Sequence, residues 1–242
     1  MQEKAIAAVS FNDFLRDQPP KAVILRHDVD KLPSNSLLFA ELEHKRGFRS
    51  TYYFRSVPAS FDSEIIKKIS LLGHEIGYHY EDMDLANGDV DQAYSSFRKN
   101  LAQLRELVPV NTVCMHGSPL SRHDNRDMWK KYDYSKDGII GEPYFDLDFS
   151  KLFYLTDTGR KWNNSDASIR DKVDSPFKIE IKNTAHLIKL IREERQPDLI
   201  MINTHPQRWH DNIFLWIKER LWQNSKNLVK KVINKRRNKD LS

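Results

Sequence analysis

The chain has 242 residues, 39% hydrophobic and 30% charged, with a formal net charge of +5 at pH 7. This length suits one α/β domain with a substantial core, and the composition excludes a fibrous or disordered chain. The single cysteine, Cys114, excludes an intrachain disulfide and a cysteine-built zinc cage, so any metal must be held mainly by His, Asp or Glu. No apolar run approaches the roughly 20 residues that cross a bilayer, and the N-terminal segment lacks the apolar core of a secretory signal, which predicts a cytoplasmic protein.

Short apolar segments rich in β-branched residues alternate with segments of helical period. This alternation is typical of repeated βα units and predicts an α/β fold with a largely parallel sheet. The predicted strands are residues 22–25, 50–54, 75–78, 112–115, 152–155 and 199–202.

Predicted helices occupy the intervals between these strands. They cover residues 34–46, 62–73, 93–108 and 184–195, and a last helix begins near His210. Asp62 is the expected N-cap of the second helix, and Gly73 ends it. Apart from its short strand, the stretch from Tyr132 to Asp174 lacks periodicity and predicts long loops, which inside a compact domain are often functional.

Polar residues follow nearly every predicted strand at its C-terminal end. In a parallel sheet or barrel these ends share one edge, where α/β enzymes place their sites. Any one cluster is consistent with a helix cap or a solvated turn, but five together favour a functional site. The clusters are Arg26-His27-Asp28-Val29-Asp30, His79-Tyr80-Glu81-Asp82, His116-Gly117-Ser118-Pro119, Thr156-Asp157-Thr158-Gly159-Arg160 and Asn203-Thr204-His205-Pro206.

The first cluster offers two carboxylates. Asp28 and Asp30 flank Val29, so their side chains share a face if the strand conformation continues. They can share a metal ion, or one can bind the ion while the other acts as general base toward water. The plainer interpretation is a loop whose aspartates cap the helix that begins near Ser34.

Imidazoles suited to a divalent ion follow the third and fourth strands. His79 is a candidate ligand, with Asp30 as the oxygen ligand. The third ligand stays open from the residues alone. His116 either binds the metal or orients substrate, and Glu81 and Asp82 compete for the same place.

His205 precedes Pro206, and a histidine there suits a general acid that protonates a leaving amine or alkoxide. Asp157 and Arg160 can tune these groups, because a carboxylate can hold His205 in one tautomer and a guanidinium can keep the base carboxylate ionised. The plainer interpretation is a loop-bound histidine and a surface turn.

Other reaction classes receive little support. There is no phosphate-cradling glycine loop and no serine nucleophile elbow, which lowers the kinase, dinucleotide and serine-hydrolase interpretations. Cys114 lies within an apolar strand and is expected in the core. Trp162, Tyr144, Phe145 and Trp209 offer flat rings for a sugar, although core packing is the usual role of such side chains.

Together, these motifs resemble the NodB-homology polysaccharide deacetylases, and the chain looks like a divergent member. The resemblance runs from Ile24 to Pro206 through the segments ILRHDVD, GHEIGYH, HGSP and INTHP. It implies a distorted (β/α) barrel and a divalent metal, zinc or another, that supports hydrolysis of an N- or O-acetyl group on a sugar. It also implies that Asp28 is the base, Asp30 and His79 are ligands, and His205 is the acid.

Two departures from the family pattern stand out. The position four after His79 carries Met83 instead of a second histidine ligand, and methionine is a poor partner for such an ion. Glu81, Asp82 or His116 replaces it, or the site is weakened or lost. The family's arginine in the third motif is also absent, and Arg160 or Arg26 is expected to compensate.

The resulting hypothesis is a carbohydrate deacetylase domain over residues 1–210 that acts on an acetylated sugar or glycan, a nucleotide- or lipid-linked intermediate of cell-surface polysaccharide metabolism. The alternatives are a metal-free carbohydrate-binding pseudoenzyme and a hydrolase of a non-sugar C–N bond on the same fold.

Residues 211–242 are expected to form a basic C-terminal helix and tail. No acidic residue interrupts the stretch from Lys226 to Lys239. This pattern predicts a peripheral membrane contact, whereas a solvated helix face is the plainer interpretation, and no nucleic-acid partner is expected. One side of the segment carries Ile217, Leu221, Leu228 and Val232.

Overall fold

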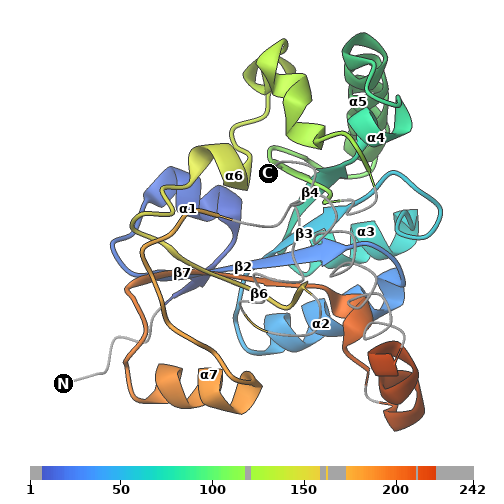
Figure 1. Ribbon diagram of the computed structural model, residues 1–242. Helices are drawn as coiled ribbons and strands as arrows, with labels where there is room; N and C mark the ends of the chain where they lie inside the picture. Colours follow the sequence, from blue (N-terminus) through green and yellow to red (C-terminus); the bar gives the residue numbers. More distant parts are fainter. Residues whose placement is uncertain (1–6, 118–120, 159–161, 163–172, 211, 222–242) are drawn as a thin grey trace.

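A computed structural model describes residues 7–117, 121–158, 162, 173–210 and 212–221 (Figure 1). Its centre is a seven-stranded parallel sheet in which the order β5-β4-β3-β2-β7-β6 places β2 in the middle, and β1 pairs with the first half of β2. The strands are β1 (Ala8–Val9), β2 (Ala22–Val29), β3 (Thr51–Phe54), β4 (Glu75–Tyr80), β5 (Val113–Met115), β6 (Phe153–Thr156) and β7 (Leu199–Thr204).

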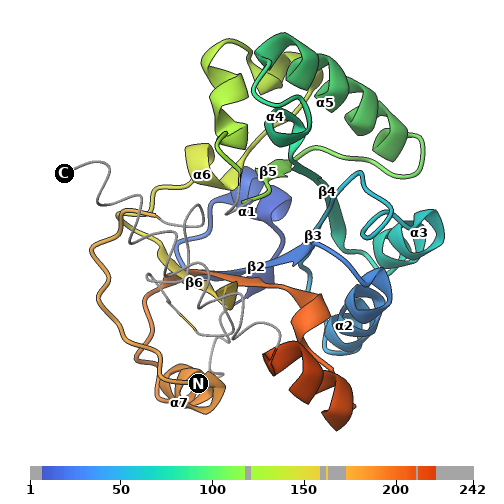
Figure 2. The same ribbon diagram turned by 45° about the vertical axis from the view of Figure 1, so that its right-hand side comes forward.

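Helices alternate with the strands and cover the outside of the sheet (Figure 2). They are α1 (Phe11–Asp17), α2 (Pro33–Lys45), α3 (Ser63–Leu71), α4 (Asp82–Leu85), α5 (Val90–Arg105), α6 (Pro143–Asp146) and α7 (Thr184–Arg192). Short 3-10 helices are η1 (Asn125–Lys130), η2 (Tyr134–Asp137) and η4 (Pro206–Arg208), and residues 213–221 are helical. The Asp62 side chain caps α3 by accepting from the amides of Glu64 and Ile65, as predicted.

The sheet is curled. Buried side chains from the strands at its two ends, β5 and β6, belong to one cluster inside it. Cys114 of β5, Tyr154 of β6 and Ile24 of β2 belong to one buried cluster. Phe11 of α1 joins this cluster, and its amide donates to the Thr51 hydroxyl at the start of β3, so α1 closes the end of the barrel that faces the strands' N-termini. No pairing joins β5 to β6 in the described part of the chain, so the barrel is open there.

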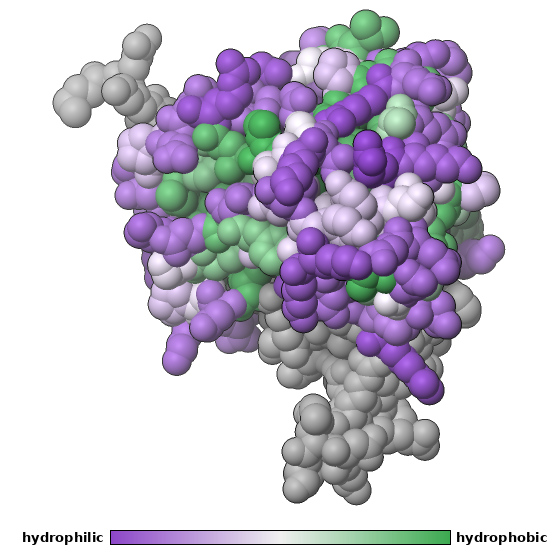
Figure 3. Space-filling model, turned by 90° about the horizontal axis from the view of Figure 1, so that it is seen from above, coloured by the Kyte–Doolittle hydropathy of each residue, from purple (hydrophilic) through white to green (hydrophobic). Residues whose placement is uncertain are grey.

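Separate apolar layers hold the helices against the outside of the sheet. One buried cluster contains side chains of the strands β2, β3, β4 and β5 and of the helices α2, α3 and α5. Another contains side chains of β6, β7 and α7. Burial of such apolar faces is the main stabilising contribution in a domain of this kind. The surface seen from above is mostly hydrophilic with small apolar patches, as is usual for a folded domain (Figure 3).

The predicted fold, a distorted (β/α) barrel, is confirmed, and all six predicted strands are present. Strand β1 and helix α1 were not predicted, because a two-residue strand and a short helix carry little periodic signal. The stretch from Tyr132 to Asp174 contains η2 and α6 where only loops were expected. None of the helices among the described residues has the length and apolarity to cross a membrane.

Candidate metal centre and catalytic residues

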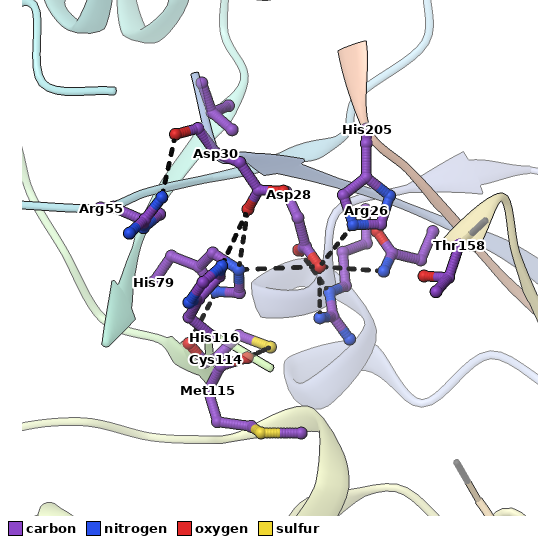
Figure 4. A network of polar contacts seen from close by, with 12 residues as sticks. Arg26, Asp28, Asp30, Arg55, His79, Cys114, Met115, His116, Thr158 and His205 are labelled. Carbon is purple, nitrogen blue, oxygen red and sulfur yellow. Dashed lines mark hydrogen bonds and ion pairs between the residues drawn. The ribbon is translucent and has the colours of Figure 1, made fainter. Parts of the chain in front are cut away.

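The described residues of the polar clusters gather at the C-terminal edge of the sheet, as predicted. Asp28 is the next-to-last residue of the central strand β2, and His205 directly follows its neighbour β7. His79 lies on β4, two strands away on the other side. Figure 4 shows Asp28 between the two imidazoles. The helix-cap interpretation of the aspartates is wrong, because Leu32 is the N-cap of α2 and no side chain caps that helix.

Asp30, His79 and His116 form a candidate metal site. Their ligand atoms lie within 4.8 Å of one another. Asp30 Oδ1 is 3.7 Å from His79 Nε2 and 3.5 Å from His116 Nε2, and the two rings meet edge to face. Ligand atoms at the tetrahedral corners around zinc lie about 3.4 Å apart, so this spacing suits a single ion.

The hydrogen bonding of these residues also fits a cation. Asp30 Oδ2 accepts from Gln207 Nε2 at 2.9 Å, whereas the buried Oδ1 has no hydrogen-bond partner among the described residues. A buried carboxylate oxygen without a partner is costly, and a bound cation would satisfy it. His79 Nδ1 donates to the Cys114 carbonyl oxygen at 2.9 Å, which leaves the Nε2 lone pair directed at Asp30. Burial lowers the pKa of His79 to about 4, so the ring is neutral at pH 7 and able to bind metal.

A second group of potential ligands consists of Asp28, His79 and Cys114. Asp28 already accepts three hydrogen bonds: Arg26 Nε donates to its Oδ1, and Arg26 Nη2 and Asn203 Nδ2 donate to its Oδ2, all at 2.8–2.9 Å. A carboxylate occupied in this way has less to offer an ion than Asp30. Cys114 is fully buried in the core, as predicted.

Asp28 is held as an anion. Burial opposes its ionisation, but the Arg26 guanidinium, His79 and His205 outweigh burial and keep the pKa of Asp28 well below its usual range. Arg26 projects from the same strand, two residues earlier, so both side chains point to the barrel interior. The sequence analysis named Arg26 and Arg160 as alternatives for the cation beside Asp28, and the structure places Arg26 there. Arg160 lies outside the described residues.

His205 is oriented by Asp157. His205 Nδ1 donates to Asp157 Oδ1 at 2.6 Å, and His205 Nε2 lies 4.0 Å from Asp28 Oδ2. Burial and Arg208 oppose protonation of His205, but Asp157 prevails and raises the pKa of the imidazole. Burial also disfavours the Asp157 anion, yet Arg208 and His205 lower its pKa to about 2. This pair can present a proton at Nε2.

Several residues around this pair were not predicted. Arg208 Nη1 donates to Asp157 Oδ1 at 2.9 Å, Trp209 Nε1 donates to Asp157 Oδ2 at 2.9 Å, and Gln207 contacts Asp30. All three follow Pro206 in or just after η4, a single turn that folds them back onto the strand ends. The proline after His205 was the available signal for such a turn.

Glu81 and Asp82, the other candidates for a third ligand, do not belong to either group of potential ligands. Glu81, predicted as an alternative ligand, pairs through both oxygens with Arg55 and lies behind His116. Asp82, the other competitor, is buried beneath α5 and accepts from the hydroxyls of Tyr78 and Ser96. Of the candidates for a third ligand, only His116 faces Asp30 and His79.

A search of solved structures matches the chain to several family 4 carbohydrate esterases. A family 4 carbohydrate esterase from Streptococcus mutans matches 96% of this chain and 89% of its own, with 14% identity and a TM-score of 0.47. One from Streptomyces lividans, in complex with acetate, matches 86% and 90%, with 16% identity and a TM-score of 0.44. A mutant of a pseudoenzyme of the same family matches 87% and 63%, with 15% identity and a TM-score of 0.45.

No protein-family model matches the chain, and no match was found among curated proteins. At these identities and TM-scores, function has to be inferred from the side chains themselves.

Proposed function

We propose that this protein is a metal-dependent hydrolase that removes an N- or O-linked acetyl group from a carbohydrate. The observation that carries the proposal is Asp30 Oδ1, which has no hydrogen-bond partner among the described residues. It faces the Nε2 atoms of His79 and His116 beside the Asp28–His205 pair. Zinc is the proposed ion because the set combines one oxygen and two imidazole ligands and leaves a position for water or substrate. When bound, the ion supplies Lewis acidity that polarises the acetyl carbonyl and lowers the pKa of a water molecule.

The residues around the candidate metal site divide the proton transfers. Asp28, kept ionised by Arg26, accepts the proton from the attacking water at a carboxylate oxygen. Its low pKa makes Asp28 a weak base, so it would rely on the acidity that a bound ion would give to the water. His205 donates its Nε2 proton to the departing nitrogen or oxygen, while Asp157 keeps the Nδ1 proton in place.

A sugar is the proposed substrate, and Trp209 supports this at the rim of the site. The residue is 36% exposed, its indole N–H donates to Asp157, and its ring meets that of Phe39 in an edge-to-face contact. A fixed, partly exposed indole offers an apolar platform to a pyranose face. The nucleotide- or lipid-linked sugar of cell-surface polysaccharide metabolism stays a prediction, as do the cytoplasmic location and the domain limits at residues 210 and 211.

The proposal is tested by metal content and acetate release. Protein purified without chelator should hold about one equivalent of a divalent metal. His79→Ala and Asp30→Ala should lose it, and acetate should be released from acetylated sugars only by the loaded wild type. A wild type that binds no metal after reconstitution would leave the carbohydrate-binding pseudoenzyme, and metal binding with activity only on non-sugar amides would leave the C–N hydrolase.

The helix over residues 213–221 supports a second proposal, a peripheral membrane contact. Its Glu219 pairs with Lys31 at 3.6 Å, next to Asp30 in the chain. Phe214 and Leu221 are 79% and 64% exposed. We propose that these apolar side chains and the basic sequence after them bind an anionic lipid surface and bring the site to a lipid-linked sugar.

Co-sedimentation with vesicles tests this contact. Wild type should sediment with vesicles that contain phosphatidylserine and stay in solution with phosphatidylcholine alone. Phe214→Asp with Leu221→Asp should abolish sedimentation, as should truncation after Asn224. Leu71→Asp, at an exposed leucine of α3, is the matched control and should sediment like wild type. Unchanged sedimentation of the truncated chain would refute the contact.

A further inference from the structure

The residue four after His79 cannot reach the candidate metal site. Met83 lies in α4, is 4% exposed and belongs to the buried cluster that includes Tyr80 and Phe97. The chain turns away from the sheet edge at Asp82, so a side chain at position 83 points into the core. A ligand for this part of the site must come from another strand.

The register between β4 and β5 brings His116 to that place. His79 is level with Cys114 and Tyr80 with Met115, and the His116 amide donates to the Tyr80 carbonyl at 2.8 Å. His116 therefore stands beside Glu81 at the end of the two strands, with its Nε2 atom toward Asp30.

Glu81 and Arg55 hold this histidine from behind. Glu81 Oε2 lies 3.2 Å from His116 Nδ1, an ion-pair contact, and His116 Nδ1 makes no hydrogen bond to any described residue. Arg55 donates to both oxygens of Glu81 at 2.9 and 2.6 Å. A third nitrogen of Arg55, Nη1, donates to the backbone carbonyl of Asp30 at 3.2 Å.

These contacts form a closed network of four residues, Arg55, Glu81, His116 and Asp30. Arg55 joins the backbone of one candidate ligand, Asp30, to the carboxylate that faces the other, His116. The side chains of Glu81 and Arg55 are 8% and 20% exposed, so solvent screens the pair only in part. The two charges offset each other, so the pair orients the ligands without adding net charge beside the ion.

We infer that Glu81 and Arg55 are positioning residues that make His116 a metal ligand in place of the side chain at position 83. A carboxylate at Nδ1 selects the tautomer that leaves Nε2 unprotonated and sets the ring orientation. Arg55 fixes the carboxylate and the Asp30 backbone in one geometry. This inference rests on the proposed metal-dependent function and assigns the residues that complete its ion site.

The test measures metal affinity. The dissociation constant for Zn²⁺ is determined by competition with a chromophoric chelator for wild type, Glu81→Gln, His116→Ala and the double variant. Loss of such an outer carboxylate weakens binding about 10- to 100-fold. His116→Ala should weaken it more. The double variant should bind no more weakly than His116→Ala, because Glu81 acts through the imidazole.

Two further variants separate positioning from folding. Asp82→Asn neutralises a buried carboxylate one residue away that contacts Tyr78, Ser96 and Asn100 but no candidate ligand, so metal affinity should be unchanged even if the melting temperature falls. Arg55→Lys keeps the charge but loses the two-pronged contact, and it should weaken binding less than Glu81→Gln.

The outcomes are distinct. Wild-type affinity in Glu81→Gln, or a Glu81 effect of the same size in the His116→Ala background, would overturn this inference alone. A wild type that binds no metal would overturn the proposed function and this inference together. Equal weakening by Asp82→Asn would mean that Glu81 acts only through the stability of the fold, which also overturns it.

Discussion

Asp28 and Asp30 stand two residues apart and are held in opposite ways. Both oxygens of Asp28 are occupied, by Arg26 and Asn203. Asp30 uses one oxygen to accept from Gln207, and its buried Oδ1 has no hydrogen-bond partner in the described part of the chain. A carboxylate surrounded by donors stays an anion of fixed orientation, whereas one with an open oxygen can take a cation. In the proposed function, this difference lets one short motif provide a proton acceptor and a metal ligand.

Exchanging each aspartate for asparagine is the strongest way to break this comparison. Asp28→Asn should lower kcat for acetate release by about two to four orders of magnitude, the usual contribution of a general base, and retain the metal. Asp30→Asn should lose metal and activity together. Parallel measurements of metal content and kcat check both, and metal loss in Asp28→Asn would contradict the division of roles.

Removal of the cation beside Asp28 should have the next largest effect. Arg26→Met leaves a buried carboxylate without its partner, and the free energy of unfolding should fall by about 3–5 kcal/mol. Urea denaturation measures this change. The double variant Arg26→Met with Asp28→Asn should recover part of the loss, and no recovery would indicate that Arg26 stabilises by packing on Tyr53 and Tyr144 instead.

On the side of Asp30, protonation of His79 at acid pH should lower the free energy of unfolding of the metal-free protein. The pKa of His79 is about 4 in the folded chain, below the ordinary value of 6.5, because burial disfavours the imidazolium. Between these values the unfolded chain binds the proton more readily. The neutral His79 ring therefore contributes about 3 kcal/mol to the free energy of unfolding above pH 6.5. This contribution is lost as the pH falls to 4. Urea unfolding of wild type and His79→Gln from pH 7 to 4 checks this: the variant should show a shallower decline, and parallel curves would contradict it.

The smallest expected effect concerns Asp157, which orients the proposed general acid His205. Trp209→Phe keeps an aromatic side chain but removes one of the donors to Asp157. The activation free energy should rise by about 1 kcal/mol, which is roughly a fivefold decrease in kcat. His205 Nδ1 and Arg208 still hold the carboxylate in this variant. Steady-state kinetics measure the decrease, and a loss as large as that of Asp157→Asn would mean that the indole contributes more than its hydrogen bond.

Local patterns in the sequence were sufficient for the architecture and for most of the site. Strand and helix periods predicted the parallel sheet, because amphipathic spacing is set by neighbours in the chain. The strand ends then predicted that Asp28, Asp30, His79, His116, Asp157 and His205 would meet at one edge. Their assembly there follows from parallel topology alone, without knowledge of the strand order.

Only the tertiary structure decided which of these residues contact one another. The choice of His116 over Glu81 and Asp82 depends on the β4–β5 register, and the outward turn at Asp82 buries Met83. Arg26 reaches Asp28 because both face the interior of a curled sheet, and Arg208 reaches Asp157 because η4 folds back beside β7. Such contacts are set by register, strand order and turn geometry, and these come from long-range packing that no local spacing encodes.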